Sequence, residues 1–120
     1  MKKSDALGQF EQLVLASVLV LGQQAYGVTI FEKVGEMAER PVKIGSVYIT
    51  LDRLEDKGYL SSWLADPTPE RGGKRKRYYR ILSAGERALR EALDTSRRIE
   101  DTVEESWRIG KWRPKTAKKI

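Results

Sequence analysis

Apolar residues recur every three or four positions over three successive stretches in the first half of the chain, which predicts three helices. The first helix is expected over 9–22 and the second over 28–39, each with one apolar side. Pro41 ends the second helix, and a brief strand is expected at 42–44. The third helix is expected over 45–57, with Ser46 as its N-cap and Gly58 just past its end.

The third helix carries two stripes of opposite character. One stripe is apolar and is expected to pack under the first two helices, and the other, roughly a quarter-turn away, is polar. The polar stripe holds short hydrogen-bonding groups and one arginine, side chains that read base edges. The alternative is that Ser46 only caps the helix and Arg53 only pairs with an acid. The apolar stripe comprises Val47, Leu51 and Leu54, and the polar stripe comprises Ser46, Thr50 and Arg53.

Beyond the third helix, alternation with a period of two predicts a hairpin. Its strands are expected over 60–65 and 76–82, joined by a polar loop with prolines and glycines. In the second strand, Tyr79 and Ile81 are expected to face inward, and Tyr78 and Arg80 to be more exposed. Trp63, on the first strand, is expected to pack under the hairpin rather than to stack on bases.

The last helix is expected over 83–109, with Ser83 and Glu86 at the spacing of a capping box. Small and apolar residues recur along it in steps of three and four, and charged residues fill most other positions. So narrow a stripe has little left in its own chain to pack against, and we expect it to pair with a second copy. Folding back onto the domain is the alternative. The predicted dimerisation residues are Leu89, Ile99 and Val103.

Composition limits the chemistry of the chain. The 120 residues, 40% of them hydrophobic, allow one modest core. The chain has no cysteine and no histidine, so we expect no disulfide, no metal site, no cofactor and no enzymatic activity, and a cytoplasmic location. The apolar run at 13–21 is far shorter than the roughly 20 residues of a membrane span, and we interpret it as a buried helix.

Positive charge is concentrated in two segments. Residues 71–80 hold six Lys or Arg and no acid, and residues 111–120 hold five, which leaves −5 for the rest of a chain whose total is +6. Such clusters suit a phosphate backbone, where neutralised phosphates release counterions. A hairpin that touches DNA is therefore the first hypothesis. The alternative is a solvated hairpin that only protects a sheet edge.

Three helices, a basic hairpin and a long helix, in this order, form the winged helix-turn-helix plan with an added dimerisation helix. The predicted fold is mainly α with a small β-hairpin (α+β). We expect a DNA-binding domain over 1–82, a C-terminal dimerisation helix over 83–110 and a flexible basic tail over 111–120.

Four short segments also match a family pattern. Residues 26–30 read YGVTI, 45–60 read GSVYITLDRLEDKGYL, 72–81 read GGKRKRYYRI and 83–86 read SAGE. In order and spacing, over about 13–93, they resemble the second helix, recognition helix, wing and following turn of PadR-type transcriptional regulators. One helix after the wing is typical of the smaller subfamily. Thr29, Ile49 and Thr50 depart from the family's frequent residues, which bears on the operator sequence.

The resemblance implies a sequence-specific DNA-binding regulator, commonly a repressor, that binds a palindromic operator as a homodimer. It implies that recognition-helix side chains lie at or near the major groove and that wing cations reach sugar and phosphate. The recognition-helix residues are Ser46, Tyr48, Thr50 and Arg53, and the wing residues are Arg71, Lys74, Arg75, Lys76 and Arg77.

Small-molecule control is the usual logic of this family, and some short members bind flat, apolar compounds between the long helices of the dimer. Trp107, near the end of the narrow stripe, is the candidate here, with Phe10 and Val103 as neighbours. The alternative is that Trp107 only supports the dimer. For the whole chain, the alternatives are a winged-helix protein-interaction module and a non-specific nucleic-acid binder.

Overall fold

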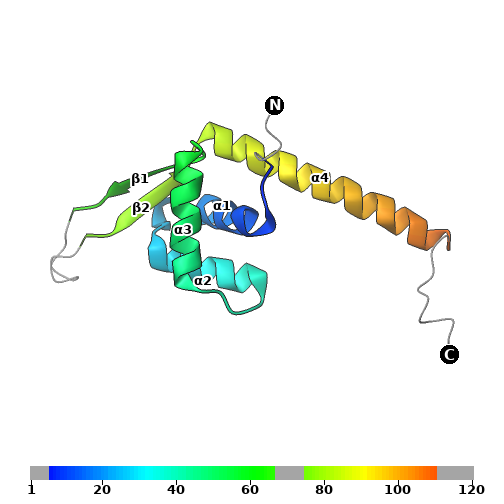
Figure 1. Ribbon diagram of the computed structural model, residues 1–120, viewed down its shortest axis with the longest axis horizontal. Coiled ribbons are helices and arrows are strands. Elements are labelled where there is room, and N and C mark those ends of the chain that lie inside the picture. Colours follow the sequence, from blue (N-terminus) through cyan, green and yellow to red (C-terminus); the bar gives the residue numbers. More distant parts are fainter. Residues whose placement is uncertain (1–5, 67–74, 111–120) are drawn as a thin grey trace.

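The computed structural model describes residues 6–66 and 75–110 of the chain. Three helices form one body, a hairpin extends from one side of it, and the last helix projects from the other (Figure 1). This arrangement is the predicted winged helix-turn-helix with an added long helix. The elements are α1 (Gln9–Leu21), the short 3-10 helix η2 (Gly22–Gln24), α2 (Gly27–Ala38), α3 (Ile44–Asp56), β1 (Leu60–Leu64), β2 (Arg77–Ile81) and α4 (Ser83–Arg108).

A single apolar core lies where the first three helices meet the root of the hairpin. Each of these helices contributes residues spaced three or four apart, so one side of each helix is buried and the other is left to solvent. The hairpin adds one residue from each strand, and α4 adds only Leu89. The core comprises Val14, Leu15, Val18, Ala25, Ile30, Val34, Val47, Leu51, Leu54, Leu60, Tyr79 and Leu89.

The start of α2 is fixed by Thr29, one of the residues that depart from the family pattern. Its hydroxyl accepts a hydrogen bond from the backbone N–H of Tyr26 at 3.0 Å and donates to the carbonyl of Gln24 at 2.6 Å. These bonds tie the chain before α2 to the first turn of the helix. The helix ends at Glu39, which has a left-handed φ of 56° two residues before Pro41.

The segment between α2 and α3 differs from the sequence prediction. No strand forms at 42–44, because Ile44 already begins α3 and Lys43 precedes it as the N-cap. Ser46 therefore lies inside the first turn of α3, and the prediction that it caps the helix was wrong. Gly58 lies just past the helix with a φ of 83°, as predicted.

The hairpin is anchored to the segment before α2. Its two strands are antiparallel, with Ser62 opposite Tyr79 and Trp63 opposite Tyr78. In addition, the backbone N–H of Tyr79 donates to the carbonyl of Ala25 at 2.9 Å, and Tyr26 forms a bridge with Tyr78. The root of the wing is thus held on both edges of β2.

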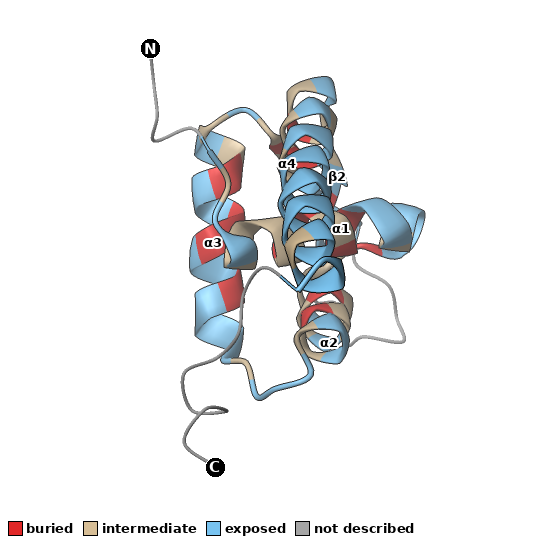
Figure 2. Ribbon diagram, turned by 90° about the vertical axis from the view of Figure 1, so that its right-hand side faces the viewer, coloured by how far each residue is buried: buried red, intermediate tan, exposed pale blue. Residues whose placement is uncertain are grey.

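The first turn of α4 packs closely against the chain that enters β1. Gly85 is buried there, and a Cβ at this position would overlap the backbone carbonyl oxygen of Tyr59. The helix is preceded by Leu82, which makes no side-chain cap, so the predicted capping box of Ser83 and Glu86 is not formed. Beyond Leu89 the helix leaves the domain, and most of its residues there are exposed (Figure 2).

Leu89 was predicted to be a dimerisation residue, and this was wrong. Its side chain is 4% exposed because it packs into the core of its own domain. The apolar stripe of α4 that stays exposed in the single chain begins after Leu89. Ile99 and Val103, the other two predicted dimerisation residues, are 59% and 36% exposed.

Candidate nucleic-acid interface

Helix α3 presents one face to solvent and one to the core. The apolar stripe of Val47, Leu51 and Leu54 is buried as predicted. Thr50 is buried with it, at 4% exposure. Its place in the polar stripe was therefore wrong, because Thr50 follows Val47 by three positions and precedes Leu54 by four, which puts it on the buried side. Of the polar stripe, Ser46 and Arg53 are exposed.

Two exposed isoleucines on α3 were missed by the sequence prediction. Ile49 is 61% exposed and lies between Ser46 and Arg53 on the solvent face, and Ile44 is 41% exposed at the first turn. An exposed aliphatic side chain on such a helix matches the methyl group of thymine in the major groove. The signal in the sequence was an isoleucine that falls outside the apolar stripe.

Arg53 is exposed and forms no ion pair with another described residue. Among the described residues, the ion pairs are Lys33 with Glu36, Lys57 with Glu11, and two within α4, and none includes Arg53. The alternative in which Arg53 pairs with an acid is thus not seen in this part of the chain. Lys57, in contrast, holds Glu11 of α1 at 3.0 Å and joins the end of α3 to α1.

Tyr48 lies at the edge of the exposed face and contacts the start of α2. Its side chain is 42% exposed, and its hydroxyl lies above Gly27, where a Cβ would overlap the phenol ring. The glycine of the 26–30 segment therefore makes room for an aromatic residue of α3. This close approach fixes where the Tyr48 hydroxyl meets solvent.

The two adjacent wing residues Lys76 and Arg77 point to opposite faces of the hairpin. The Arg77 guanidinium donates to the Ser62 hydroxyl at 2.9 Å, and that hydroxyl donates to the Glu55 carboxylate of α3 at 2.8 Å. Arg77 therefore lies on the α3 side. The Lys76 ammonium lies on the other face, 3.7 Å from the centre of the Tyr26 ring. Arg75 is exposed, whereas Arg71 and Lys74 lie outside the described residues.

Aromatic side chains cover the outer face of the hairpin. Trp63 stacks on Tyr78 with ring centres 6.1 Å apart, and Tyr78 meets Tyr26 edge-on at 5.3 Å. Trp63 is 47% exposed, so the prediction that it packs under the hairpin was wrong. The pairing of β1 with β2 places Trp63 opposite Tyr78 on the outer face, whereas Tyr79 points into the core as predicted.

Acidic groups lie near the inner face of the wing. Burial raises the pKa of Tyr79 above its usual value of 10.0, and the carboxylate of Asp52 on α3 adds to this shift. Glu55 acts in the same direction, whereas Arg77 opposes it. The surface where α3 meets the wing therefore holds both cations and acids. The position of each cation, more than the total charge of the surface, determines where an anion can bind.

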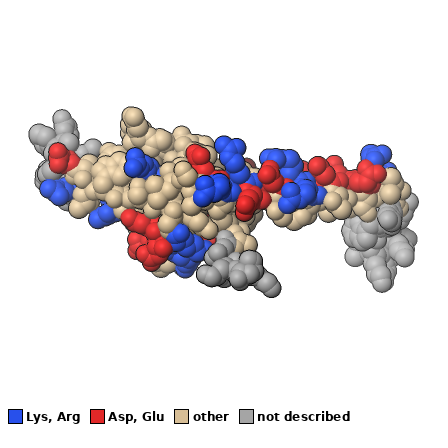
Figure 3. All heavy atoms as spheres, turned by 90° about the horizontal axis from the view of Figure 1, so that it is seen from above, with Lys and Arg blue, Asp and Glu red and all other residues tan. Residues whose placement is uncertain are grey.

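Helix α4 likewise carries charges of both signs. Lys and Arg are interleaved with Asp and Glu along the projecting helix (Figure 3). Between these charges runs an exposed apolar stripe. Its members are Leu93, 45% exposed, Ile99, 59%, Val103, 36%, and Trp107, 57%.

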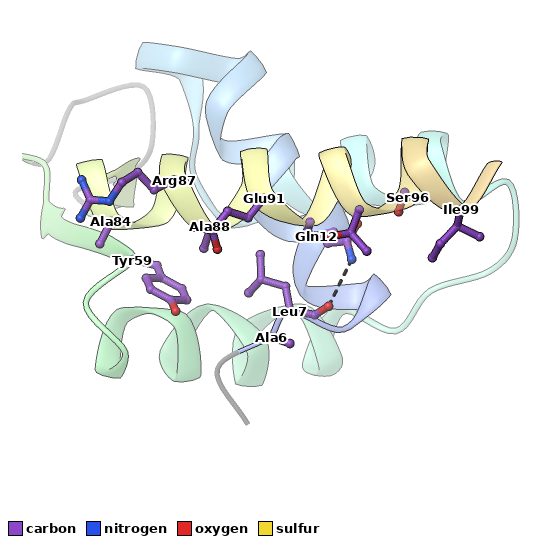
Figure 4. A pocket seen from close by; sticks show the side chains of 12 residues that line it. Ala6, Leu7, Gln12, Tyr59, Ala84, Arg87, Ala88, Glu91, Ser96 and Ile99 are labelled. Carbon is purple, nitrogen blue, oxygen red and sulfur yellow. Dashed lines mark hydrogen bonds between the residues drawn. The ribbon is translucent and has the colours of Figure 1, made fainter. Parts of the chain in front are cut away.

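An open groove of about 730 Å³ lies beside this stripe (Figure 4). Leu7, just before α1, and Gln12 of α1 form one wall, and α4 from Ala84 to Ile99 forms the other, with Tyr59 at one end. Gln12 donates to the Leu7 carbonyl at 3.2 Å. Because the groove joins segments far apart in the sequence, periodicity could not have indicated it.

The predicted effector residues do not meet within one chain. Phe10 packs partly against the core and lines a shallow hollow with Ser46 and residues 40–43. Trp107 lines a different hollow, among charged side chains at the far end of α4. In the part of the chain that the structure describes, no cluster of metal-binding side chains is found. None of the described helices is long and apolar enough to cross a membrane.

Comparison with known proteins gives one consistent result. The family model described as "Transcriptional regulator PadR-like family" matches residues 15–91. The chain is 26% identical to a PadR family transcription regulator from Clostridium difficile R20291, with a TM-score of 0.68, over 82% of this chain and 97% of that one. It is 28% identical to a PadR family regulator from Eggerthella lenta DSM 2243, with a TM-score of 0.66, over 82% and 80%. An uncharacterized protein from Lysinibacillus sphaericus is 28% identical over 107 residues, which are 87% of this chain and 94% of the relative.

Proposed function

Because the chain belongs to the PadR-like family of transcriptional regulators, we propose that it is a homodimeric repressor that binds a palindromic operator and is released by a small apolar molecule. Binding of DNA and regulation of transcription, rather than catalysis, follow from membership of the family. The observation that carries the finer proposal is that side-chain hydrogen bonds through Ser62 join Arg77 of the wing to Glu55 of α3, so that the wing and α3 are held together.

The recognition helix supplies the contacts that select a sequence. Arg53, which has no ion pair among the described residues, can donate two hydrogen bonds to one guanine. Ser46 and Ile49 lie on the same face, where a hydroxyl and an aliphatic group meet base edges and thymine methyls. Tyr48 contributes from the edge of this face, and Thr50 does not contribute because it is buried.

The wing supplies phosphate contacts. Arg77 lies on the α3 side, so it can reach the backbone of the same duplex, and the exposed Arg75 lies nearer the tip. Lys76 points away from α3 and is held against Tyr26, so we propose a weaker role for it. Arg71 and Lys74 lie outside the described residues, and their phosphate contacts stay a prediction from the sequence.

Two copies are proposed to pair through the exposed stripe of α4. Four large apolar side chains in register on a solvated helix favour a partner helix, and a second copy offers the same stripe. A twofold pair would place two α3 helices on one face of the duplex, with half-sites about 34 Å apart along it. We expect the groove between α1 and α4 to receive part of the partner's helix.

The proposed effector site is formed between two copies. Trp107 is exposed on α4 and Phe10 lies on α1, so only a partner's helix can bring such side chains together. A flat, apolar compound would stack on the indole ring there. Trp107→Ala should abolish quenching of tryptophan fluorescence by a true effector. Quenching that survives in this variant would exclude Trp107 from the site.

The proposal is tested by fluorescence anisotropy with labelled DNA from upstream of the chain's own gene and with random duplex of equal length. We expect the upstream DNA to be preferred by orders of magnitude. Arg53→Ala should lower this preference by ~1–3 kcal/mol, whereas Arg77→Ala should weaken both complexes and reduce the salt slope by about 1. Equal affinity for the two duplexes would identify a non-specific binder instead.

A further inference from the structure

We infer that Ser62 is a positioning residue for DNA binding, which holds the Arg77 guanidinium on the α3 side of the wing and separates it from Glu55. The inference rests on the proposed contact between Arg77 and phosphate. It adds a residue that the basic and aromatic patterns of the sequence do not indicate, since Ser62 is a small polar residue in the middle of β1.

The hydroxyl of Ser62 is used twice. It donates to Oε2 of Glu55 at 2.8 Å and accepts from Nη1 of Arg77 at 2.9 Å. The three side chains come from three elements, α3, β1 and β2, and they form one chain of hydrogen bonds across the inner face of the hairpin. Tyr79, directly opposite Ser62 in the strand register, is buried beneath this face. The relay therefore rests on a packed surface.

A direct pair of Arg77 with Glu55 would compete with phosphate for the wing cation. Among the described residues the ion pairs do not include one between these two groups. The serine donates to one oxygen of the Glu55 carboxylate and, among the described residues, takes one of the five N–H donors of the guanidinium. The remaining donors can bind a phosphate in a bidentate manner.

Holding the Arg77 side chain in place also lowers the entropic cost of binding DNA. An arginine side chain in solution loses rotamer freedom when it meets a phosphate, and an arginine that is already hydrogen-bonded loses less. Without Ser62, the guanidinium would be free to turn toward Glu55 or into solvent. We therefore expect the loss of this hydroxyl to act on DNA binding through Arg77 and through no other group.

The test is a mutant cycle with Ser62→Ala, Arg77→Ala and the double variant, measured by anisotropy with upstream and random duplex over a range of salt concentrations. Ser62→Ala should weaken binding to both duplexes by ~3- to 10-fold, the equivalent of one hydrogen bond. In the Arg77→Ala background the same change should alter affinity by less than about 2-fold. Ser62→Thr, which keeps the hydroxyl, should restore wild-type binding.

Ser61→Ala is the matched control. Ser61 is the neighbouring residue on β1, is partly buried like Ser62, and is paired with Arg80 on the opposite face of the hairpin. It should leave binding within about 2-fold of wild type. A Ser62→Ala protein that binds like wild type would overturn the inference. So would an effect of equal size with and without Arg77, because it would show a purely structural role.

The outcome for the wild-type chain separates this inference from the proposed function. If the wild type binds neither duplex in a salt-dependent manner, the proposed function fails and the inference fails with it. If the wild type prefers upstream DNA but the cycle is additive, the proposed function stands and only the role of Ser62 is refuted. Circular dichroism of each variant confirms that the affinities are measured on folded protein.

Discussion

Truncation of Ile99 should weaken the proposed dimer without unfolding the domain. Ile99 lies on α4 beyond the last residue that joins the core, and 59% of its surface is exposed in the single chain. The Ile99→Ala variant therefore removes apolar surface that only a partner can cover. The helix itself should be unaffected, since alanine is the best helix former.

The size of the effect follows from the area that a partner would cover. Burial of one methylene is worth ~0.8 kcal/mol, and isoleucine has three more carbons than alanine, so an exposed fraction of 59% gives about 1–1.5 kcal/mol per copy. A twofold interface contains Ile99 from both copies, so the loss of binding free energy is ~2–3 kcal/mol per dimer. The dimer Kd should rise about 30- to 150-fold.

Sedimentation velocity over a range of concentrations measures this Kd. The matched control is Ile49→Ala, which removes the same group from a residue with 61% exposure on α3. The control should leave the dimer Kd unchanged and weaken binding of upstream DNA. A dimer Kd that is equal in wild type and Ile99→Ala would refute the assignment of the α4 stripe as the interface.

Three further predictions concern stability and specificity. Gly85→Ala should lower the free energy of unfolding by ~1–3 kcal/mol, because its Cβ would overlap a backbone carbonyl. Gly35→Ala, with open space around it in α2, should raise that free energy by about 0.5–1 kcal/mol; urea denaturation measures both, and equal effects would contradict the close approach. Thr50→Ala should cost stability and leave the preference for upstream over random DNA unchanged, in contrast to Arg53→Ala, as measured by anisotropy. Because burial raises the pKa of Tyr79 above 10.0, the folded state keeps a proton that the unfolded state loses, so its contribution to stability is complete below pH 10 and falls as the pH rises through the folded pKa. Tyr79→Phe should show a shallower loss of stability above pH 10 than wild type, and an identical slope would show that this phenol plays no part.

The sequence predicted the elements well because each carries a clear period. Helix α1 and the hairpin strands begin at the predicted residues or within one position of them, since apolar spacing and flanking glycines mark these limits. The helical periodicity was less informative for residues at the border between the buried and the exposed face of a helix. Thr50 looked polar and was assigned to solvent, yet its angular position on the helix buries it beside Leu54.

The wrong predictions at the site share one physical cause. The burial and the contacts of these residues depend on tertiary packing rather than on the local pattern. Leu89 fits the stripe of α4 equally well whether it packs against a partner or against its own domain, and only the placement of the helix decides. The alternation along β2 separates Lys76 from Arg77, but the sequence does not tell which face meets α3. The Ser62 relay and the contact of Tyr48 with Gly27 likewise depend on distances between elements.

The junction between the wing and the projecting helix has a mechanical consequence. Only Leu82 separates β2 from α4, and Gly85 brings the first turn of α4 against the chain before β1, so we expect the helix and the DNA-binding domain to move together. With 26 residues, α4 is ~39 Å long. In the proposed pair, joined through the stripe between Leu93 and Trp107, a tilt of about 10° at the middle of the stripe would displace each DNA-binding domain by ~4 Å, or about one base-pair step. In such a dimer, the tolerance for operator spacing would be set by the packing of the two α4 helices, remote from the duplex.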